Sequence, residues 1–379
     1  MVKTILFDVD GVFLSEERCF DATALSIWEL VYNPLYLGLS GDTFTVSPTE
    51  ENIRRIREHV LSNDAILQFV KDRGINSNWD MVFLTFSHQL VRLLYELSLE
   101  RREFVESILQ RPIDKDRLRE IGEACNESNI SFIPNYDEFV RDFQQTDVEQ
   151  QDLLLYVNDL ARHWLGIDDD LFPINNPLWE LGRKVYQEWY LGDPYYEQSE
   201  RERPYTLGKN GFLEDEIALA NVEDIRSFLR DLREKGYLLG IGTSRPYLEC
   251  KIPFQRLGFW EYFHPEHVVT ATDVSEAERK FPNQVPLGKP KPFTYVKGYK
   301  GRKVADEKVL SIPLPIHKGE DVLIIGDSVA DYMAAQSMGC KIAAILTCCL
   351  SGKASRSMFE ALNADYIFDD VLQLREILL

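Results

Sequence analysis

Asp8 and Asp10 stand one residue apart at the end of a short apolar run near the start of the chain. The run Lys3–Asp8 is predicted to be a β-strand, and Gly11 after it lets the chain turn sharply. In a parallel sheet, ligands bind just beyond the carboxyl ends of the strands. Carboxylates there could attack an electrophile, carry a proton or bind a cation. An acidic turn after a strand also occurs for structural reasons alone.

Asp327 and Asp331 form a second acidic pair, after the apolar run Val322–Gly326. Asp327 is at the expected end of a strand, where its carboxylate could bind a hard cation. Asp331 is one turn into the helix that follows and could face the same site. The alternative is that Asp327 and Ser328 only cap this helix.

Thr243 and Ser244 place two adjacent hydroxyl groups at the end of another expected strand, Tyr237–Gly242. Residues of these types are common helix caps. Lys289 lies in the segment 288–292, whose prolines stiffen the backbone and suppress helix before it. A surface turn has the same pattern, so neither segment indicates a site when it is taken alone.

Short apolar runs alternate with helical stretches from Tyr237 to the end of the chain. This alternation predicts a doubly wound, Rossmann-like α/β fold, with a parallel sheet and helices on both faces. One helix is predicted over Val222–Lys235, with Asn221 as its N-cap and Gly236 at its end. The remaining expected strands are His267–Thr270, Ile342–Leu346 and Tyr366–Phe368.

Residues 15–220 have a different pattern, with long amphipathic stretches and no strand alternation, which predicts a mostly α-helical module. The strand Lys3–Asp8 cannot stand alone, because an isolated buried strand leaves its backbone groups unpaired. We therefore expect it to pair with the C-terminal sheet. Residues 1–14 plus 221–379 then form the core, and residues 15–220 form a domain inserted after the first strand. The clearest helical stretches are Asn52–Asp72, Met81–Leu109 and Asp147–Leu165.

The chain has 379 residues, more than one ordinary compact domain holds, and a formal net charge of -20. Such a charge repels polyanions, so no nucleic-acid partner is expected. No apolar run approaches the roughly 18 residues that cross a bilayer, so no membrane partner is expected either. A small phosphorylated molecule could still bind if a cation and a few basic groups reverse the charge locally.

The N-terminal residues lack the apolar core and the cleavage site of an export signal. The cysteines follow no disulfide framework and no zinc-type spacing, and adjacent Cys348 and Cys349 would form a strained bridge. The other cysteines are Cys19, Cys125, Cys250 and Cys340. We therefore expect reduced thiols and a cytoplasmic location.

Taken together and in this order, the four segments resemble the motifs of the haloacid dehalogenase superfamily, in its phosphatase-like branch. These motifs are Asp-x-Asp-Gly, a strand ending in Thr, Lys-Pro-x-Pro and Gly-Asp-Ser-x-x-Asp. The resemblance covers residues 1–14 and about 221–379. Two features depart from the common pattern. Val12 stands where many relatives have Thr, and the segment between Lys289 and Asp327 is longer than usual. This segment contains a basic stretch, residues 297–303, which we expect to be a solvated charge run.

The resemblance implies a role for each motif residue in phosphoryl transfer, whose transition state needs charge stabilisation and in-line positioning. Asp8 would attack phosphorus and form an aspartyl phosphate, which water then hydrolyses. Asp10 would protonate the leaving oxygen and later activate the water. Thr243 and Ser244 would bind phosphoryl oxygens, and Lys289 would supply positive charge.

The resemblance also implies Mg²⁺ as the cofactor, because without a cation the carboxylates would repel a phosphate. The expected ligands are Asp8, Asp327 and the backbone carbonyl of Asp10. Ser328 and Asp331 are expected to support these ligands indirectly or through water. The inserted module would be the helical cap of this family, which opens for substrate and closes to exclude water.

A magnesium-dependent phosphatase acting on a small phosphorylated metabolite is therefore the expected function. The alternatives are a phosphomutase of the same superfamily and a non-catalytic, ligand-binding relative. A dehalogenase is disfavoured, because that chemistry uses neither magnesium nor a second acid two residues after the nucleophile. The sequence leaves open the substrate, the choice between phosphatase and mutase, the role of the large cap and of the stretch 297–303, and the oligomeric state.

Two further segments of the inserted module are candidates for a function. The returning segment 201–211 lies near the inferred hinge and carries basic groups, among them Lys209, which could contact the leaving group. The acidic run Asp168–Asp170 looks like a metal cluster. It has no spaced partner ligands, so we expect a loop or the start of a helix.

Overall fold

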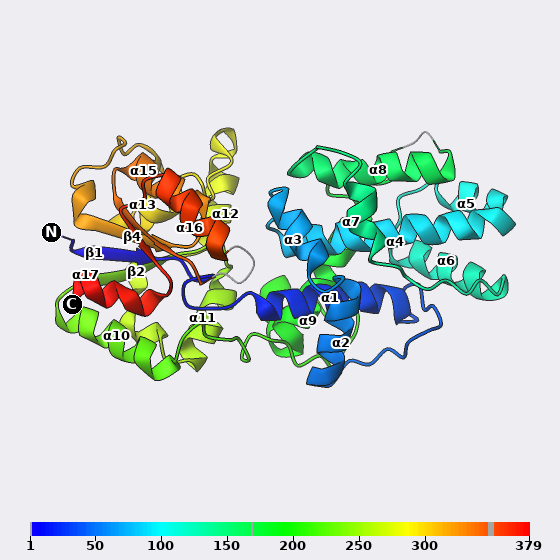
Figure 1. Ribbon diagram of the computed structural model, residues 1–379, viewed down its shortest axis with the longest axis horizontal. Helices are drawn as coiled ribbons and strands as arrows, with labels where there is room; N and C mark the ends of the chain where they lie inside the picture. The colour runs from blue at the N-terminus through cyan, green and yellow to red at the C-terminus, as the bar shows by residue number, and fades with distance from the viewer. Residues whose placement is uncertain (1, 168–169, 348–351) are drawn as a thin grey trace. The chain divides into compact units, whose positions relative to one another are not determined.

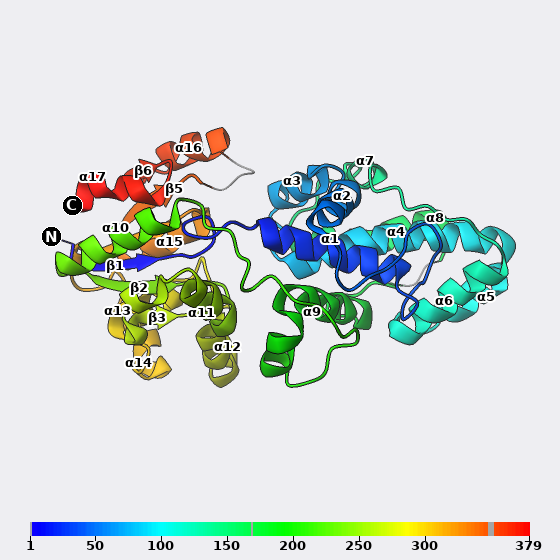
Figure 2. The same ribbon diagram turned by 90° about the horizontal axis from the view of Figure 1, so that it is seen from below.

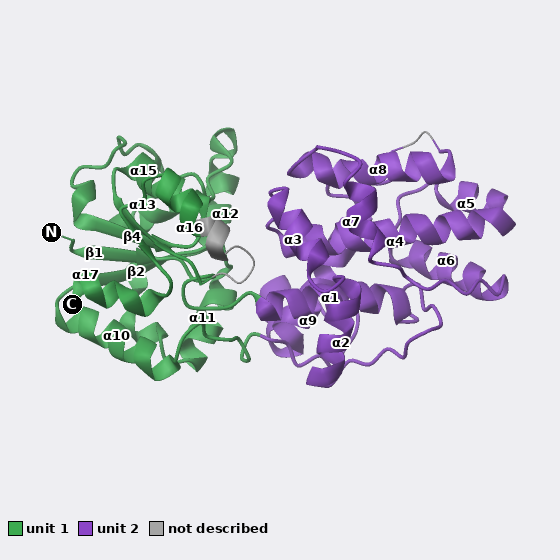
Figure 3. Ribbon diagram, viewed as in Figure 1, with its two compact units in different colours: residues 1–16, 213–379 green, residues 17–212 purple. Residues whose placement is uncertain are grey.

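The computed structural model, drawn in two views in Figure 1 and Figure 2, describes residues 2–167, 170–347 and 352–379, with the side chains of 352–355 left aside. The chain divides into two compact units, residues 1–16 with 213–379 and residues 17–212 (Figure 3). We call them the sheet unit and the helical unit. The first boundary lies two residues after 14/15 and the second lies eight residues before 220/221. The assignment of the two units as catalytic core and cap stays a prediction. Cys348, Cys349, Asp168 and Asp169 lie outside the described residues.

The sheet unit contains a parallel sheet of six strands in the order β3-β2-β1-β4-β5-β6. This order is typical of a Rossmann fold and confirms the predicted α/β architecture. β1 pairs with both β2 and β4, so that Phe7 lies opposite Ile241 and Ile325. The first strand therefore joins the C-terminal sheet, as predicted. The strands are β1 Thr4–Phe7, β2 Leu238–Gly242, β3 Val268–Val269, β4 Val322–Gly326, β5 Lys341–Ile345 and β6 Tyr366–Phe368.

Helices cover both faces of the sheet (Figure 1), so its central strands are buried on both faces. Ile5 and Phe7 on β1 pack into one core with α10, α11 and α17, whereas Leu6 packs into the other core with α13 and α15. The two cores hold the strand ends in fixed positions. The helices are α10 Val222–Glu234, α11 Tyr247–Arg256, α12 Ala271–Lys280, α13 Phe293–Lys300, α14 Asp306–Leu310, α15 Val329–Met338, α16 Gly352–Ala361 and α17 Arg375–Leu378.

α10 shows how local signals define one of these helices. The side chain of Asn221 accepts hydrogen bonds from the N–H groups of Glu223 at 3.0 Å and Asp224 at 3.2 Å, so it is the predicted N-cap. Gly236 follows the helix with φ at +87°, a conformation that favours glycine. The apolar face of α10 is buried against the sheet and consists of Ile225, Phe228, Leu229 and Leu232.

The helical unit is built around α4, which packs against α1, α8 and α9 (Figure 2). The predicted stretch Asn52–Asp72 is divided into α2 and α3, because residues 62–64 all have positive φ, between 50° and 65°. A right-handed helix cannot continue through such a segment. The helices are α1 Glu17–Tyr32, α2 Glu50–Val60, α3 Ala65–Asp72, α4 Asn78–Glu100, α5 Arg102–Ile108, α6 Lys115–Glu127, α7 Glu138–Phe143, α8 Gln151–Leu165 and α9 Pro177–Glu200.

Over the part of the chain that the structure describes, no helix combines the length and the apolar character that a membrane span requires. The cysteines in this part are all buried and form no disulfide, in agreement with the expected reduced thiols. They are Cys19, Cys125, Cys250 and Cys340.

The two connections between the units run side by side. The N–H of Ser15 donates to the carbonyl of Ile217 at 2.8 Å, and the N–H of Leu219 donates to the carbonyl of Phe13 at 3.0 Å. An antiparallel bridge lies between these two bonds. The chain therefore leaves the sheet unit and returns to it at one place, shortly after β1.

His88 is a core residue of the helical unit, and its ring packs against the rings of Phe139 and Phe143. The side-chain amide of Gln89 donates to Nδ1 at 2.9 Å, so the proton of neutral His88 is on Nε2, which lies 2.9 Å from a carboxylate oxygen of Asp142. Burial lowers the pKa of His88 below its usual value, against the opposing effect of Asp142.

We expect His88 to destabilise the folded protein as the pH falls from 7 to 5. An unfolded histidine binds a proton near a pH of about 6.5. Folded His88 binds its proton only at lower pH, so acidification favours the unfolded state. Thermal unfolding at both pH values measures the effect. The change in stability from pH 7 to pH 5 should be more favourable in His88→Gln than in the wild type, whereas replacing the exposed His163 by Gln should leave this change as in the wild type. Equal changes in the wild type and His88→Gln would contradict this prediction.

Candidate active site

Asp8 and Asp327 follow two adjacent strands, β1 and β4, at the carboxyl edge of the sheet. Phe7 and Ile325 are opposite each other in the register, so both strands deliver a carboxylate to the same place. The strand order reverses between β1 and β4, and Rossmann-like sheets bind their ligands at this switch point. The carboxylates of three residues come close together, and one oxygen of each lies within 4.8 Å of the other two; the residues are Asp8, Asp327 and Asp331. We call these three residues the carboxylate cluster.

Lys289 reaches the carboxylate cluster from the loop before α13. Its Nζ donates to Oδ2 of Asp8 at 2.6 Å and to Oδ1 of Asp331 at 2.8 Å. The hydroxyl of Tyr295 on α13 also donates to Oδ1 of Asp331, at 2.7 Å, and the hydroxyl of Ser328 donates to its Oδ2 at 2.7 Å. Asp331 therefore has several partners, and it fixes the position of Lys289 beside Asp8.

Burial determines the charge balance of the cluster. Burial raises the pKa of Asp8 to about 7, against the lowering effect of Lys289. Burial and the charges of Asp8 and Asp331 hold the pKa of Asp327 well above its usual range. For Asp331, burial acts in the same direction, but Lys289 and the hydrogen bonds hold its pKa below the usual value. The three carboxylates thus have one ammonium group beside them, that of Lys289. When Asp8 and Asp327 are both ionised, the cluster carries an excess of negative charge.

The cluster suits a divalent cation. Mg²⁺ prefers oxygen ligands and is often bound through one or two carboxylates. Asp8 and Asp327 supply such oxygens. Burial, and after it the neighbouring carboxylates, raise their pKa values, so a cation nearby would favour their ionised forms. Asp331 shares the site, although its oxygens accept hydrogen bonds from Lys289, Tyr295 and Ser328. The donor set therefore fits the predicted ion.

Two glycines allow these carboxylates to lie against the backbone. Gly11 has φ at +67°, and a Cβ added there would lie 2.0 Å from Oδ2 of Asp327. A side chain is therefore disfavoured at Gly11 by its conformation and also by its neighbour. A Cβ on Gly326 would lie 2.5 Å from the carboxylate of Asp331. Gly326 ends β4 and Gly11 lies in the turn after β1, and each also leaves room for a carboxylate of the site.

We expect Gly11→Ala to displace Asp327 and to weaken both Mg²⁺ binding and turnover, the latter by about 100-fold, as for a reacting group moved by about 1 Å. A Mg²⁺ titration followed by calorimetry and a turnover assay measure the two effects. Gly236→Ala is the matched control, because Gly236 also has positive φ but has no atom near the added Cβ. Similar losses in both variants would attribute the effect to backbone strain and not to Asp327.

Thr243 and Ser244 follow β2, the strand next to β1, but their surroundings differ. Thr243 is buried, and its N–H donates to the carbonyl of Val269 at 3.1 Å. Its hydroxyl oxygen accepts the N–H of Arg245 at 3.1 Å. Ser244 is exposed. Local hydrogen bonds therefore fix Thr243, while Ser244 lies at the surface of the loop.

Asp10 is bound by a cation that the sequence analysis did not identify. The guanidinium of Arg245 donates from Nε to both oxygens of Asp10, at 2.9 and 3.0 Å, and from Nη2 to Oδ1 at 2.6 Å. Its Nη1 donates to Oε1 of Glu216 at 2.7 Å. The carboxylate proposed to carry protons is thus held by a buried arginine, which a second carboxylate anchors.

The sequence offered different signals for the residues that were missed. Arg245 directly follows the two hydroxyl residues after β2, so its position in the sequence indicates that it lies at the carboxyl edge of the sheet. Tyr295 is hidden among the apolar residues of α13 and has no motif of its own. Glu216 lies in the connection from the helical unit, where only the pairing of the two connections brings it close to Arg245.

The family model for haloacid dehalogenase-like hydrolases matches residues 2–339 of the sequence. The chain belongs to this family. This hydrolase is similar over its whole length to an X-ray structure of a Northeast Structural Genomics Consortium target, with 37% identity, 98% of that chain covered and a TM-score of 0.89.

Two other solved structures resemble this hydrolase more distantly. One is a conserved haloacid dehalogenase-like protein of unknown function from Agrobacterium tumefaciens, 12% identical, with 100% of this chain and 97% of that chain covered and a TM-score of 0.42. The other is a HAD-superfamily hydrolase from Geobacter sulfurreducens, 14% identical, with 100% and 96% covered and a TM-score of 0.39. A search of curated proteins found no match.

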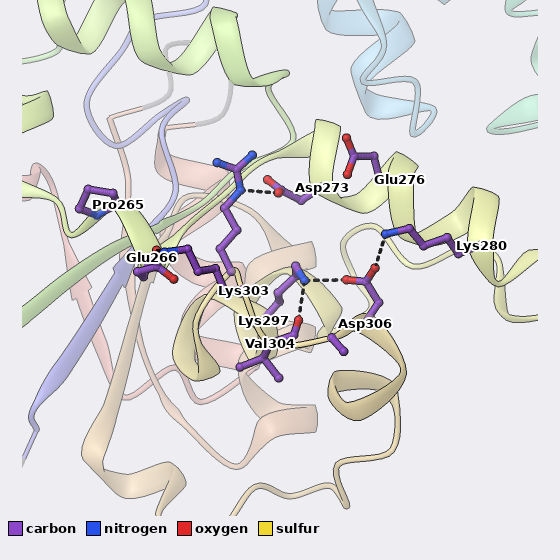
Figure 4. A pocket seen from close by; sticks show the side chains of 11 residues that line it. Pro265, Glu266, Asp273, Glu276, Lys280, Lys297, Lys303, Val304 and Asp306 are labelled. Carbon is purple, nitrogen blue, oxygen red and sulfur yellow. Dashed lines mark hydrogen bonds and ion pairs between the residues drawn. The ribbon is translucent and has the colours of Figure 1, made fainter.

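The basic stretch 297–303 of this hydrolase lines a cavity of about 490 Å³ between α12 and the loop after α13 (Figure 4). Lys297 is buried and donates to Asp306 at 2.6 Å, and Arg302 donates to Asp273 at 2.6 Å. Figure 4 shows the side chains of Lys297 and Lys280 both paired with Asp306. The expectation of a solvated charge run is therefore wrong for Lys297, which stabilises the loop after α13.

Lys209, in the returning segment of this hydrolase, is buried in the helical unit. Its Nζ lies 2.7 Å from Oε2 of Glu29 and 2.6 Å from Oε2 of Glu188, and all three side chains are 0% exposed. The ammonium also lies over the ring of Trp189, 4.9 Å from its centre. Within the segment 201–211, Lys209 is therefore not the group that contacts a leaving group, and the expectation for the rest of the segment stays a prediction. Lys209 ties the returning segment to α1 and α9.

Proposed function

We propose that this hydrolase is a magnesium-dependent phosphatase that acts on a small phosphorylated metabolite through an aspartyl phosphate on Asp8. The observation that carries the proposal is the meeting of Asp8, Asp327 and Lys289 at the carboxyl ends of β1 and β4. A nucleophilic carboxylate needs opposite charge nearby before it can approach an anion. Lys289 and a cation on the cluster would supply that charge within a chain of net charge -20.

In the proposed reaction, a carboxylate oxygen of Asp8 attacks phosphorus and the bond to the leaving oxygen breaks. Asp10 gives a proton to that oxygen, and then takes a proton from the water that attacks the aspartyl phosphate. Phosphate leaves and the Asp8 carboxylate is restored. Lys289 and the hydroxyl of Thr243 bind the phosphoryl oxygens during both steps. Bound Mg²⁺ would supply the charge that offsets repulsion between carboxylates and phosphate.

We assign the helical unit as the cap over this site and as the main source of substrate selection. The paired connections at residues 13–15 and 217–219 support this assignment, because they insert the whole helical unit directly after the nucleophile. The strong negative charge favours a small phosphoester over a nucleic acid.

A panel of small phosphoesters, assayed with and without Mg²⁺, tests the proposed function. We expect phosphate release from some members, and we expect chelation of Mg²⁺ to abolish it. Exchange of labelled phosphate between substrates without net release would show that the protein is a phosphomutase and not a phosphatase. Binding of Mg²⁺ and of a phosphate mimic without any turnover would indicate a ligand-binding protein and would reject the proposal.

A further inference from the structure

Arg245 binds the Asp10 carboxylate in a geometry that fixes its orientation. Three hydrogen bonds of 2.6–3.0 Å run from Nε and Nη2 to the two oxygens of Asp10. Two nitrogens of a rigid guanidinium define the plane of a bound carboxylate, whereas a lysine would act as a point charge. The Asp10 side chain is thus held in one rotamer, although it is 32% exposed.

The other end of Arg245 is anchored in the protein interior. Its Nη1 donates to Glu216 at 2.7 Å and to the carbonyl of Glu249 at 3.2 Å. The Arg245 side chain is 6% exposed, and that of Glu216 is 1% exposed. The backbone N–H of Arg245 donates to the hydroxyl of Thr243, so the residue is fixed at both ends. A guanidinium group held in this way can fix the orientation of a more exposed partner, here the carboxylate of Asp10.

The arrangement also separates Asp10 from the carboxylate cluster. The described carboxylates that could share one cation are Asp8, Asp327 and Asp331, and Asp10 is not among them. Lys289 belongs to the cluster, and Arg245 belongs to Asp10. Each carboxylate of the Asp-x-Asp motif therefore has its own basic partner. These separate partners keep Asp8, the proposed nucleophile, apart from Asp10, the proposed proton carrier.

We infer that Arg245 is a positioning residue, which holds Asp10 where it can transfer a proton to the leaving oxygen of the substrate, and that Glu216 holds Arg245. This inference rests on the proposed phosphatase function and goes beyond it, because it gives a role to Arg245, which donates to Asp10, Glu216 and Glu249 and is not one of the residues assigned to the proposed reaction. Glu216 lies in the connection that pairs with residues 13–15, so the position of Asp10 is linked to the connection between the units.

A leaving-group series tests the inference, with kcat/KM measured for aryl phosphates with good leaving groups and for alkyl phosphates with poor ones. Proton transfer to the leaving oxygen matters most for a poor leaving group, and a placed acid contributes roughly 100- to 10,000-fold. Arg245→Met should therefore lower kcat/KM for alkyl phosphates by about 100-fold and for aryl phosphates by less than about tenfold. Arg245→Lys should recover part of the loss, and Glu216→Gln should show a weaker form of the same pattern.

The double variant Asp10→Asn with Arg245→Met separates positioning from a general loss of structure. If Arg245 acts through Asp10, the double variant is no slower on alkyl phosphates than Asp10→Asn alone. Additive losses, or equal losses on aryl and alkyl phosphates in Arg245→Lys and Glu216→Gln, would overturn the inference and leave the proposed function standing. A wild-type protein that releases no phosphate from any substrate would overturn both.

Discussion

Asp8→Asn is expected to abolish phosphate release, with turnover reduced by at least about 10,000-fold. The amide has almost the same shape as the carboxylate, but it is a poor nucleophile and cannot form an acyl phosphate. Phosphate release from an active panel substrate at saturating Mg²⁺ measures the loss. Mass spectrometry of the acid-quenched protein should show a phosphorylated species for the wild type and none for the variant.

Asp10→Asn provides the comparison for Asp8→Asn. It should lose most of the turnover while keeping Mg²⁺ binding, because the predicted contact from residue 10 to the ion is its backbone carbonyl. A circular dichroism spectrum identical to that of the wild type confirms that each variant is folded. Near-normal turnover in Asp8→Asn would refute the nucleophile assignment, and unchanged turnover in Asp10→Asn would refute the role in proton transfer.

Lys289→Met is expected to remove both activity and stability. The variant removes the ammonium group bound to Asp8 and Asp331, in a cluster whose three carboxylates lie within 4.8 Å of one another. Such a change costs about 3–5 kcal/mol of unfolding free energy in the metal-free protein. Denaturant unfolding in the presence of a chelator measures this cost. Mg²⁺ should stabilise the variant more than the wild type, because the ion would then be the main positive charge at the cluster.

The pH dependence of Lys289→Met gives an independent test. Burial raises the pKa values of Asp8 and Asp327, so the folded protein holds protons that the unfolded chain has released above about pH 4. The metal-free variant should therefore lose stability as the pH rises from 4 to 7. Lys291→Met, two residues along the same loop at an exposed position, is the control and should behave as the wild type. Equal stability of both variants would contradict the assigned role of Lys289.

The sequence was sufficient for the sheet. Each strand of the structure begins and ends within one residue of its predicted run, because apolar runs bounded by Gly, Asp or Pro are strong signals. The break at residues 62–64 was not predicted, because nothing in the apolar spacing required it, although Asn and Asp adopt positive φ more often than most other residues. The burial of Lys209 was missed for a similar reason, since its partners come from α1 and α9, far away in the chain.

Within the candidate site, the motifs predicted which residues would meet at the strand ends but not how they would be paired. Asp8, Lys289 and Asp327 follow from strand order alone. The pairing of Asp10 with Arg245 depends on side-chain rotamers and on Glu216, a residue outside every motif. Contacts of this kind follow from tertiary packing, which local sequence patterns do not encode.

The hydrogen-bonded pair of connections at residues 13–15 and 217–219 makes the sheet topologically independent of the segment between them. A loop of any length can join two points that are already held together, because its closure adds only a slowly growing entropy term. Helices can thus be gained, lost or replaced between residues 17 and 212 without shifting the register of β1. Such a junction lets the helical unit change while the residues at the strand ends keep their positions.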